Sequence, residues 1–554
     1  MSLDHVDQNT LPPSQDPEAT AGIVNPPNTF WGILKSLGPG LIIAGSIVGS
    51  GELIGTTKAG AQAGIVLLWL IIIGCLIKVF VQVELGRYAL SEGESTLAAL
   101  DRLPGPRWRV HALVWYWCIM VLAGFGQLGG IVGGVGQSLA ITFPVTGDYL
   151  TAIRTPSHSD LQKFIDWEDD AVAGGQKLAA LSPAERERID NNREWMREQL
   201  NALGAPGEAR LAEVRAGTKT KDPLTFDDRL WAAVIAVMTS LLLGVGRYRV
   251  IQDLSTILVV VFTFVSIGNV FALQTTADWH IPASEFLEGL KFRLPQGKEA
   301  IATALAVFGI IGVGASELIA YPYWCLEKGY ARFAGRRSPD AAWAVRAKGW
   351  IRVMIIDALV SMVVYTIATL AFYLMGVAVL HNAGRDPEGM RMVTTLAFAY
   401  EPVFGAYAKW LFLLGAVAVL YSTFLVANAS NSRMVLDALK LFGVVDRSQQ
   451  SAHDKWLTRL SMALPLVCLA IFIAGGDPIT LVLFSGMMQA LMLPLLAAAA
   501  LYSRYTQTDS RLRPSPLWDL CLILSALGML VAGLWGANVN IEKFARQFAN
   551  WFAT

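Results

Sequence analysis

Two glutamates stand inside apolar stretches of the chain, each within a similar run of small residues. Glu52 lies in residues 48–54 and Glu317 lies in residues 313–319, and Leu-Ile follows each acid. A charged side chain is costly inside a bilayer, so an acid at such a place indicates a functional site. Two acids at corresponding places in two halves of a chain indicate a binding site at broken membrane helices.

Small residues beside the two acids predict that the helices unwind there. Gly49 and Gly314 permit unusual backbone angles. Unwinding frees carbonyl oxygens, which are tolerated only against protein or a water-filled cavity. With the hydroxyl groups of Ser50 and Ser316 and the two carboxylates, they would form an oxygen-rich site for a divalent cation such as Mg²⁺, Mn²⁺ or Ca²⁺. The alternative is that each acid pairs with a lysine or a helix end and only supports the structure.

Lys78 and Gln127 are the candidate partners of these charges. Lys78 stands near the middle of an apolar run, where its ammonium cannot easily reach the membrane surface, so we expect it to pair with an acid. A fixed ion pair with Glu84 is favoured over a role in which the ammonium neutralises the two acids when no substrate is bound. Gln127 lies in a glycine-rich run, where helix packing is favoured over contact with a substrate.

Amide side chains in two later apolar runs are further candidates. Asn428, Asn431 and Gln489 offer amide oxygens at membrane depth. We expect Asn428 and Gln489 to complete the ligand shell. Asp357 has a more ordinary explanation, because Arg352 is close in sequence and can pair with it.

The composition is that of a polytopic membrane protein. Of the 554 residues, 54% are hydrophobic and only 16% are charged, against about 25% in an average globular protein. The net charge of zero gives no case for binding nucleic acid. All five cysteines stand in apolar runs, which favours buried small side chains over disulfides or a metal site. The sequence contains neither His-Glu-x-x-His nor Gly-x-Ser-x-Gly, so an intramembrane hydrolase has no support. We expect a protein that is not an enzyme and has no cofactor.

Eleven apolar runs approach the length of about 20 residues that crosses a bilayer. Lysine and arginine are concentrated in alternate connections, whereas the opposite short connections nearly lack them. This bias predicts a cytoplasmic N-terminus and an external C-terminus, in what we expect to be a bacterial inner (plasma) membrane. The expected spans are residues 38–58, 65–90, 111–143, 229–246, 250–273, 300–326, 350–380, 405–440, 457–475, 478–503 and 517–537.

Under this topology the first ten spans form two inverted repeats of five, and the two acids fall in the equivalent spans 1 and 6. The long polar stretch between spans 3 and 4 is expected to be an external, solvated insertion. The expected units are a disordered cytoplasmic tail at 1–28, a first repeat at 29–273 with the insertion at 145–227, a second repeat at 274–503, and 504–554 with span 11 and an amphipathic C-terminal tail.

Several motifs share both residues and spacing with one known family. They are Gly-Pro-Gly at 38–40, Gly-Ser-Gly-Glu at 49–52, Lys-Ala-Gly-Ala-Gln at 58–62, Leu-Leu-Trp at 67–69, Tyr-Ser-Thr-Phe at 421–424 and Gln-Ala-Leu-Met-Leu-Pro at 489–494. On these motifs the chain resembles the Nramp family of divalent metal transporters over about residues 30–500, except for the insertion. The resemblance implies an all-α polytopic membrane protein of LeuT-type fold, with 5+5 inverted repeats, broken helices 1 and 6, and alternating access.

The chain departs from the family pattern at the functional motifs. The family's metal-binding Asp and Asn in span 1 stand here as Gly49 and Glu52, and its Ala-x-x-Met-Pro-His in span 6 stands as Ala-Ser-Glu-Leu-Ile-Ala at 315–320. The acids of the family's proton path align with Gln127 and Gly130. The resemblance therefore implies the fold and the activity class, but neither transition-metal selectivity nor proton coupling. Without a thioether in the motif, harder ions are favoured.

We therefore expect a transporter that moves a divalent cation, Mg²⁺ or Mn²⁺ rather than a soft transition metal, without the usual proton coupling. Its expected partners are the lipid bilayer and that cation, as a substrate. One alternative is a secondary transporter for a small organic solute, such as an organic cation. The other is a non-transporting sensor or scaffold with the same fold.

Overall fold

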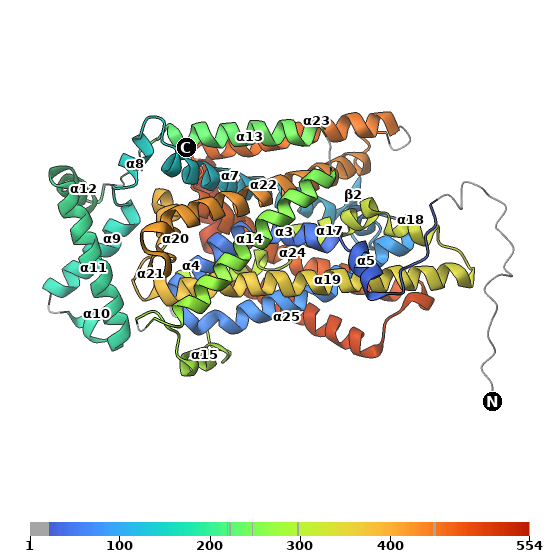
Figure 1. The fold of residues 1–554 in the computed structure, drawn as a ribbon, viewed down its shortest axis with the longest axis horizontal. Coiled ribbons are helices and arrows are strands. Elements are labelled where there is room, and N and C mark those ends of the chain that lie inside the picture. Colours follow the sequence, from blue (N-terminus) through green and yellow to red (C-terminus); the bar gives the residue numbers. More distant parts are fainter. Residues whose placement is uncertain are drawn as a thin grey trace.

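Long helices form one elongated bundle in the computed structural model, and most of them run along its long axis (Figure 1). The structure describes residues 22–552, apart from residues 174, 219, 221–222, 246–247, 277, 296–297 and 447–449. Within this part, the only β-structure is one short antiparallel hairpin of Arg107–Trp108 (β1) and Val110–His111 (β2). The predicted all-helical fold is confirmed.

Nine helices in the described residues are long and apolar enough to cross a membrane. The first, Pro39–Glu92, contains two of the expected spans, and the shorter apolar helix Val260–Leu273 corresponds to another. The eleven expected spans are therefore all accounted for by helices. The remaining eight long helices are Ala112–Thr142, Asp227–Val245, Ala300–Lys328, Ala341–His381, Glu401–Leu441, Ala452–Ile473, Pro478–Thr506 and Pro516–Gly536.

Span 1 is interrupted at Gly49, as its small residues predict. The α-helical hydrogen bonds of its first half end at Val48, and a π-helix with a wider i→i+5 pattern begins after the glycine. A Cβ atom at Gly49 would lie 1.8 Å from Thr423 Oγ1, so only glycine fits this approach. The elements of spans 1 and 2 are α3 (Pro39–Ile47), η1 (Ser50–Thr56), α4 (Thr57–Ala63), η2 (Gly64–Leu67) and α5 (Leu68–Glu92).

Span 6 is interrupted in the same way. Helix α16 (Lys298–Ile310) ends before a short non-helical segment, residues 311–314, and α17 (Ala315–Lys328) begins after it. Gly312 has φ +55°, a left-handed angle that favours glycine. The broken helices 1 and 6 of the expected fold are thus confirmed.

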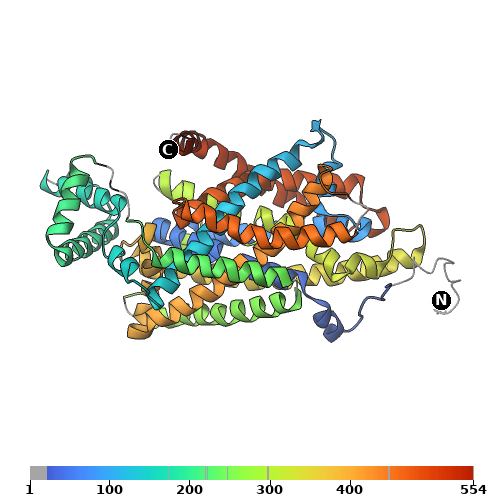
Figure 2. The same ribbon diagram turned by 90° about the horizontal axis from the view of Figure 1, so that it is seen from above.

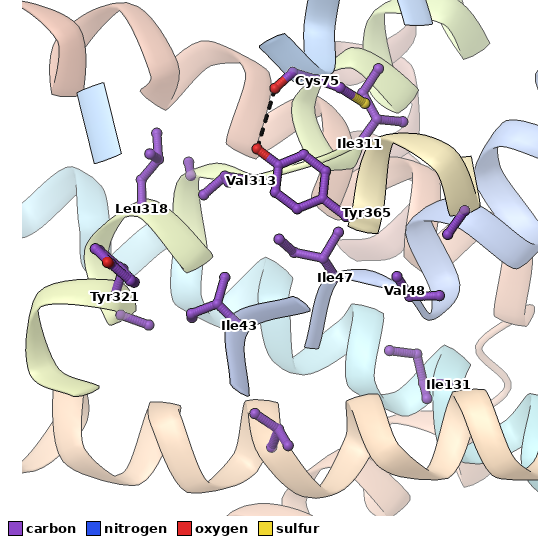
Figure 3. Packing of buried hydrophobic residues seen from close by; sticks show 14 of the residues in the cluster. Ile43, Ile47, Val48, Cys75, Ile131, Ile311, Val313, Leu318, Tyr321 and Tyr365 are labelled. Carbon is purple, nitrogen blue, oxygen red and sulfur yellow. Dashed lines mark hydrogen bonds between the residues drawn. The ribbon is translucent and has the colours of Figure 1, made fainter. Parts of the chain in front are cut away.

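Apolar side chains surround both breaks (Figure 3). Val48 and Ile47 from span 1 and Ile311 and Val313 from span 6 all belong to one buried cluster. Tyr365 also belongs to it, and its hydroxyl donates to the carbonyl of Cys75 at 3.3 Å. The unwound backbone is therefore shielded by protein, the condition under which it is tolerated at membrane depth.

Helix α7 (Ala112–Thr142), the glycine-rich span 3, packs closely against α13 (Asp227–Val245) and α24 (Pro478–Thr506). Cβ atoms at Gly130 and Gly136 would lie 2.6 Å from the Pro478 carbonyl oxygen and 2.3 Å from the Asp228 carbonyl oxygen. The glycines thus permit backbone contact between helices, as small residues do in membrane bundles. The other membrane helices are α14 (Tyr248–Leu273), α19 (Ala341–Met375) with η3 (Gly376–His381), α22 (Ala408–Leu441), α23 (Gln450–Ile473) and α25 (Pro516–Phe552).

The insertion forms a separate helical cluster at one end of the bundle, and α18 (Tyr330–Ala334) lies at the other end (Figures 1 and 2). It has a core of its own, which includes Phe164, Met196 and Leu200. Its longest helix starts with a capping box in which Ser182 and Glu185 each accept from the other's backbone N–H. The elements are α8 (Asp148–Ala152), α9 (His158–Val172), α10 (Gln176–Ala179), α11 (Pro183–Leu203) and α12 (Ala205–Arg215).

Part of the predicted N-terminal tail is ordered against the bundle, whereas the predicted C-terminal unit stays a prediction. Val24 donates to the Phe333 carbonyl at 3.1 Å and accepts from Trp350 Nε1 at 2.8 Å, so residues 22–28 of the predicted disordered tail pack on the bundle. Residues 1–21 lie outside the described residues. The predicted amphipathic tail continues α25 as one helix, and its side chains beyond Gly536 also lie outside the described part. The connecting elements are α2 (Phe30–Ser36), α6 (Thr96–Asp101), α15 (Ala283–Gly289), η4 (Gly389–Arg391), α20 (Met392–Phe398), α21 (Glu401–Phe404), η5 (Gly405–Tyr407) and η6 (Ser510–Leu512).

Candidate functional site

A small cavity with both polar and apolar walls lies between the breaks of spans 1 and 6 and helices α7 and α22. Its volume is about 40 Å³, enough for roughly three water-sized spheres. Its polar walls come from the segments that the sequence singled out, together with α22. The polar lining residues are Ser46, Ser50, Gln127, Ser316, Glu317, Thr423, Ser430 and Asn431.

Glu317 is the one carboxylate among the described lining residues. It stands in the first turn of α17, where the exposed N–H groups of a helix favour negative charge. A Cβ atom at Gly314 would lie 2.6 Å from Glu317 Oε2, so the bare backbone of Gly314 makes room for this carboxylate. The structure therefore places Gly314 behind the acid and the acid itself at the cavity.

Glu52 is fully buried and does not line the cavity. Its Oε1 accepts from Gly312 N and Thr369 Oγ1, both at 3.2 Å, and its Oε2 accepts from Gly49 N at 3.5 Å. The carboxylate thus holds the start of η1 and reaches across to the break of span 6. The two acids do not share one cavity, in contrast to the symmetric pair expected from the sequence.

Lys78 binds backbone rather than an acid. Its Nζ donates to the Phe308 carbonyl at 2.5 Å and to the Ile311 carbonyl at 2.8 Å, and the side chain is fully buried. None of the salt bridges within the described residues includes Lys78. The predicted ion pair with Glu84 is wrong, because Glu84 pairs with Arg87 at 3.1 Å instead.

Lys78 and Glu52 hold the two sides of a single peptide group. The carbonyl of Ile311 and the N–H of Gly312 belong to the same peptide bond, and one accepts from the ammonium while the other donates to the carboxylate. In a trans peptide these two groups point in opposite directions, so the cation and the anion lie at the ends of one dipole. We call this arrangement the peptide clamp. It satisfies both buried charges without direct contact between them.

Gln127 joins the two breaks through a chain of hydrogen bonds. Its Nε2 donates to Ser50 Oγ at 3.1 Å, and its Oε1 accepts from Ser485 Oγ and from Gln489 Nε2, both at 2.9 Å. Gln489 Oε1 in turn accepts from Ser316 N at 3.1 Å. Gln127 therefore belongs to the cavity wall as well as to the helix interface, and Gln489 supports the wall from behind.

Asn428 faces away from the cavity. Its Nδ2 donates to the Phe424 carbonyl at 2.8 Å, and its Oδ1 accepts from Cys468 Sγ at 3.8 Å. The α22 residues that reach the cavity are Thr423, Ser430 and Asn431, with Ala427 and Met434. Their spacing of three and four residues marks one helix face, a signal that could have separated Asn431 from Asn428 in the sequence.

Asp357 also binds backbone rather than its predicted arginine. Its carboxylate accepts from Gly38 N at 3.0 Å, from Gly40 N at 2.5 Å and from the Tyr321 hydroxyl at 3.2 Å. These contacts satisfy free N–H groups at the start of α3. Asp357 therefore fixes the half of span 1 that contributes Ser46 to the cavity.

The polar groups of the cavity wall are mostly uncharged groups that contain oxygen. Among the described residues no cluster of three or more His, Cys, Asp or Glu side chains is placed to hold a metal ion. A cation in the cavity would meet one carboxylate, the hydroxyl groups of several serines and a threonine, amide oxygens and water. That set of hard ligands fits a cation that keeps part of its hydration shell.

A charged cluster connects α4, which follows the break of span 1, to the insertion. Lys58 of α4 is buried, and its Nζ lies 2.7 Å from Asp386 and 3.3 Å from Glu388. Gln62 donates to Asp386 at 2.7 Å, and Lys163 of the insertion lies 3.3 Å from Glu388. We call these five residues the α4 cluster. It ties span 1, the loop after η3 and the insertion together.

Comparisons with known proteins agree with this architecture. A family model described as Nramp, natural resistance-associated macrophage protein-like, matches residues 210–537. Its range does not include the motifs between residues 38 and 69. No individual curated protein matches the sequence.

Solved structures of similar fold cover nearly the whole chain. A crystal structure of a variant of the Eremococcus coleocola manganese transporter has a TM-score of 0.58 and 15% identity, covering 95% of this chain and 91% of that chain. Another structure of that transporter, bound to an aromatic bis-isothiourea substituted compound, has a TM-score of 0.55 and 15% identity, covering 94% and 91%. At these identities the likeness shows the fold.

Proposed function

Since the model of the Nramp (natural resistance-associated macrophage protein-like) family matches more than half of it, the chain belongs to that family, and we propose that it moves a divalent cation across the membrane by alternating access. The observation that carries this proposal is the position of Glu317. Its carboxylate lines a small cavity between the two helix breaks, among hydroxyl and amide oxygens. The manganese transporter structures of the same fold agree with a cation substrate.

The proposed substrate is a hard cation, Mg²⁺ or Mn²⁺, rather than a soft transition metal. Most polar atoms of the wall are oxygens, which hard cations prefer. Met434 also lines the cavity and was not anticipated as part of it. One thioether among many oxygens gives a soft metal little preference over a hard cation. Glu317, Ser50, Ser316 and the Gln127 amide are the proposed contacts.

Transport without the usual proton coupling is the second part of the proposal. Gln127 stands on the α7 face at the cavity, and an amide does not release a proton at physiological pH. Cation flux is therefore expected to leave the pH of the vesicle lumen unchanged.

The size of the cavity disfavours the organic-solute alternative. Sites for drug-sized molecules measure about 300–1,000 Å³, whereas this cavity measures about 40 Å³. A scaffold without transport remains as the alternative that the transport experiment tests directly.

The proposed setting is the bacterial inner membrane, with a cytoplasmic N-terminus and an external C-terminus. Arg87 near the end of α5, Lys348 and Arg352 in the first half of α19, and Arg513 in the connection before α25 line one common cavity. Their position supports a single basic side of the membrane, which the positive-inside rule assigns to the cytoplasm. The insertion lies at the opposite end of the bundle from α18 and is then external.

The test is uptake by purified protein in sealed liposomes. We expect Mg²⁺ or Mn²⁺ to enter faster than in protein-free liposomes, Cd²⁺ to enter more slowly than either, and a lumenal pH dye to show no change. Absence of flux for every cation would refute transport and favour the scaffold. Faster uptake of Cd²⁺ would refute the preference for hard cations, and acidification coupled to uptake would refute the uncoupled mechanism.

A further inference from the structure

A second cavity lies far from the two breaks, between α5, the first half of α19 and the connection from η6 to α25. Its volume is about 290 Å³. Four basic residues line it, namely Arg87, Lys348, Arg352 and Arg513, and the described lining contains no Asp or Glu. We call it the basic cavity. Such a concentration of positive charge is a binding site for an anion unless the protein itself neutralises it.

The protein neutralises little of this charge. Lys348, Arg352 and Arg513 are exposed, and their side chains make no hydrogen bond or ion pair with other described residues. Arg87 is the one lining cation with an acid partner among the described residues, because Glu84 pairs with it at 3.1 Å. Glu84 is also shared with Arg504, 3.9 Å away. Arg504 has a closer partner in Asp519, at 2.9 Å, so Glu84 serves mainly Arg87. The other three cations of the lining have no ion pair with a described residue.

Arg87 gives an independent sign of a missing partner. Only 3% of the residue is exposed. Its Nε donates to Glu84 and its Nη1 donates to the Leu512 carbonyl at 3.1 Å, but its buried Nη2 has no hydrogen-bond partner in the described structure. Buried guanidinium donors are almost always satisfied. Arg87 also lines the basic cavity, so one of the cations of its wall has a donor that no described protein group accepts.

The other wall of the basic cavity is apolar and adjoins the lipid-facing surface. Ile351, Ile355 and Ile356 of α19 line it. Helix α25 follows the connection that contains Arg513. It begins at Pro516, and Leu517 and Leu520 in its first turns are exposed. The basic cavity thus has cationic side chains on one wall and apolar side chains on the other. A phosphate group attached to acyl chains has both of the chemistries that these walls recognise.

We propose that the basic cavity binds the phosphate of an anionic phospholipid, with its acyl chains along the isoleucine wall. Basic pockets between membrane helices on the cytoplasmic side are suited to anionic headgroups. The bound lipid holds α5 to α19, and these helices carry Lys78 and Thr369, which support the breaks. The lipid therefore stabilises the fold without belonging to the transport cavity.

The experiment uses full-length protein, delipidated in a neutral detergent, and follows thermal unfolding as lipid is added. We expect phosphatidylglycerol to raise the unfolding temperature and phosphatidylcholine to do so much less. The variant Lys348→Gln/Arg352→Gln is expected to bind phosphatidylglycerol at least about tenfold more weakly, as the loss of two cations near an anionic headgroup implies. Native mass spectrometry should show one anionic lipid retained by the wild type and lost from this variant.

A matched variant controls for net charge. Arg336→Gln/Lys455→Gln removes two exposed cations that do not line the basic cavity, and it should bind the lipid as the wild type does. Equal weakening in both variants would overturn the proposal, because the effect would then be one of overall charge. Equal stabilisation by phosphatidylcholine would also overturn it. Stabilisation by inorganic phosphate alone, to the same extent as by the lipid, would assign the site to a soluble anion and overturn the lipid as its source.

Discussion

Replacing Glu317 with glutamine is expected to slow divalent-cation uptake by about 10- to 100-fold at subsaturating cation. Glutamine keeps the size of the side chain and removes the only carboxylate of the described cavity wall. A hydrogen bond or contact to a charged group contributes about 1.5–3 kcal/mol, which corresponds to this range of affinity. The measurement is initial uptake of Mn²⁺ or Mg²⁺ into liposomes over a range of cation concentrations.

Glu327→Gln is the matched control for this prediction. Glu327 stands near the other end of the same helix, where it pairs with Arg433 and remains partly exposed. Exposed ion pairs contribute little to stability, so this variant should fold and transport as the wild type does. Glu317→Gln should also keep the wild-type unfolding temperature, because it neutralises a carboxylate that has no cation within ion-pairing distance among the described residues. Unchanged uptake by Glu317→Gln would show that the substrate does not use this cavity.

Breaking the peptide clamp is expected to lower the stability of the protein, and this effect should be larger than any change in cation affinity. Lys78→Met leaves the carbonyls of Phe308 and Ile311 without their buried donor and leaves Glu52 without the opposing charge. Removing one member of a buried, hydrogen-bonded charge arrangement costs about 3–5 kcal/mol. The free energy of unfolding in detergent should therefore fall, and Glu52→Gln should lower it as well.

A double-mutant cycle tests whether the two charges act through one peptide group. If they do, the double variant Glu52→Gln/Lys78→Met should lose less stability than the sum of the single variants, by about 0.5–3 kcal/mol. Lys409→Met, which removes an exposed lysine, serves as the control for loss of a positive charge. Strict additivity would contradict the peptide clamp, since it would mean that each side chain acts alone.

The sequence anticipated the breaks but not the direction of each side chain. Gly49 and Gly314 marked the unwound points in the sequence, and at both positions a neighbouring side chain approaches so closely that an added Cβ atom would collide with it. Glu52, however, lies in a π-helix whose i→i+5 pattern turns side chains differently from an α-helix. The repeated motif therefore suggested a symmetry that the side chains do not keep. Glu317 follows an ordinary helix start and lies where the sequence placed it, beside the break.

Hydrogen bonds from buried charged side chains to backbone groups were also not predictable from the sequence. Lys78 and Asp357 were each assigned a charged partner, because buried charges are commonly paired with charges. Both instead bind backbone groups at helix ends. Every residue has a backbone, so residue types do not show which backbone group will be the partner. Asn428 shows a third limit. Periodicity identifies a face of α22, but only the packing against α23 tells which face meets the cavity.

The α4 cluster has a consequence for the balance between access states. Lys58 and Gln62 lie beyond the break of span 1, and Lys163 belongs to the insertion. In the proposed transport cycle, an opening toward the insertion that moves α4 would separate Lys58 and Gln62 from Asp386 and Glu388, and the cost of these contacts would enter the equilibrium between the two conformations. Each 1.4 kcal/mol changes the ratio of their populations about tenfold. The insertion does not line the cavity, but its contact with Glu388 would thereby contribute to the ratio of the conformations that open to each side of the membrane.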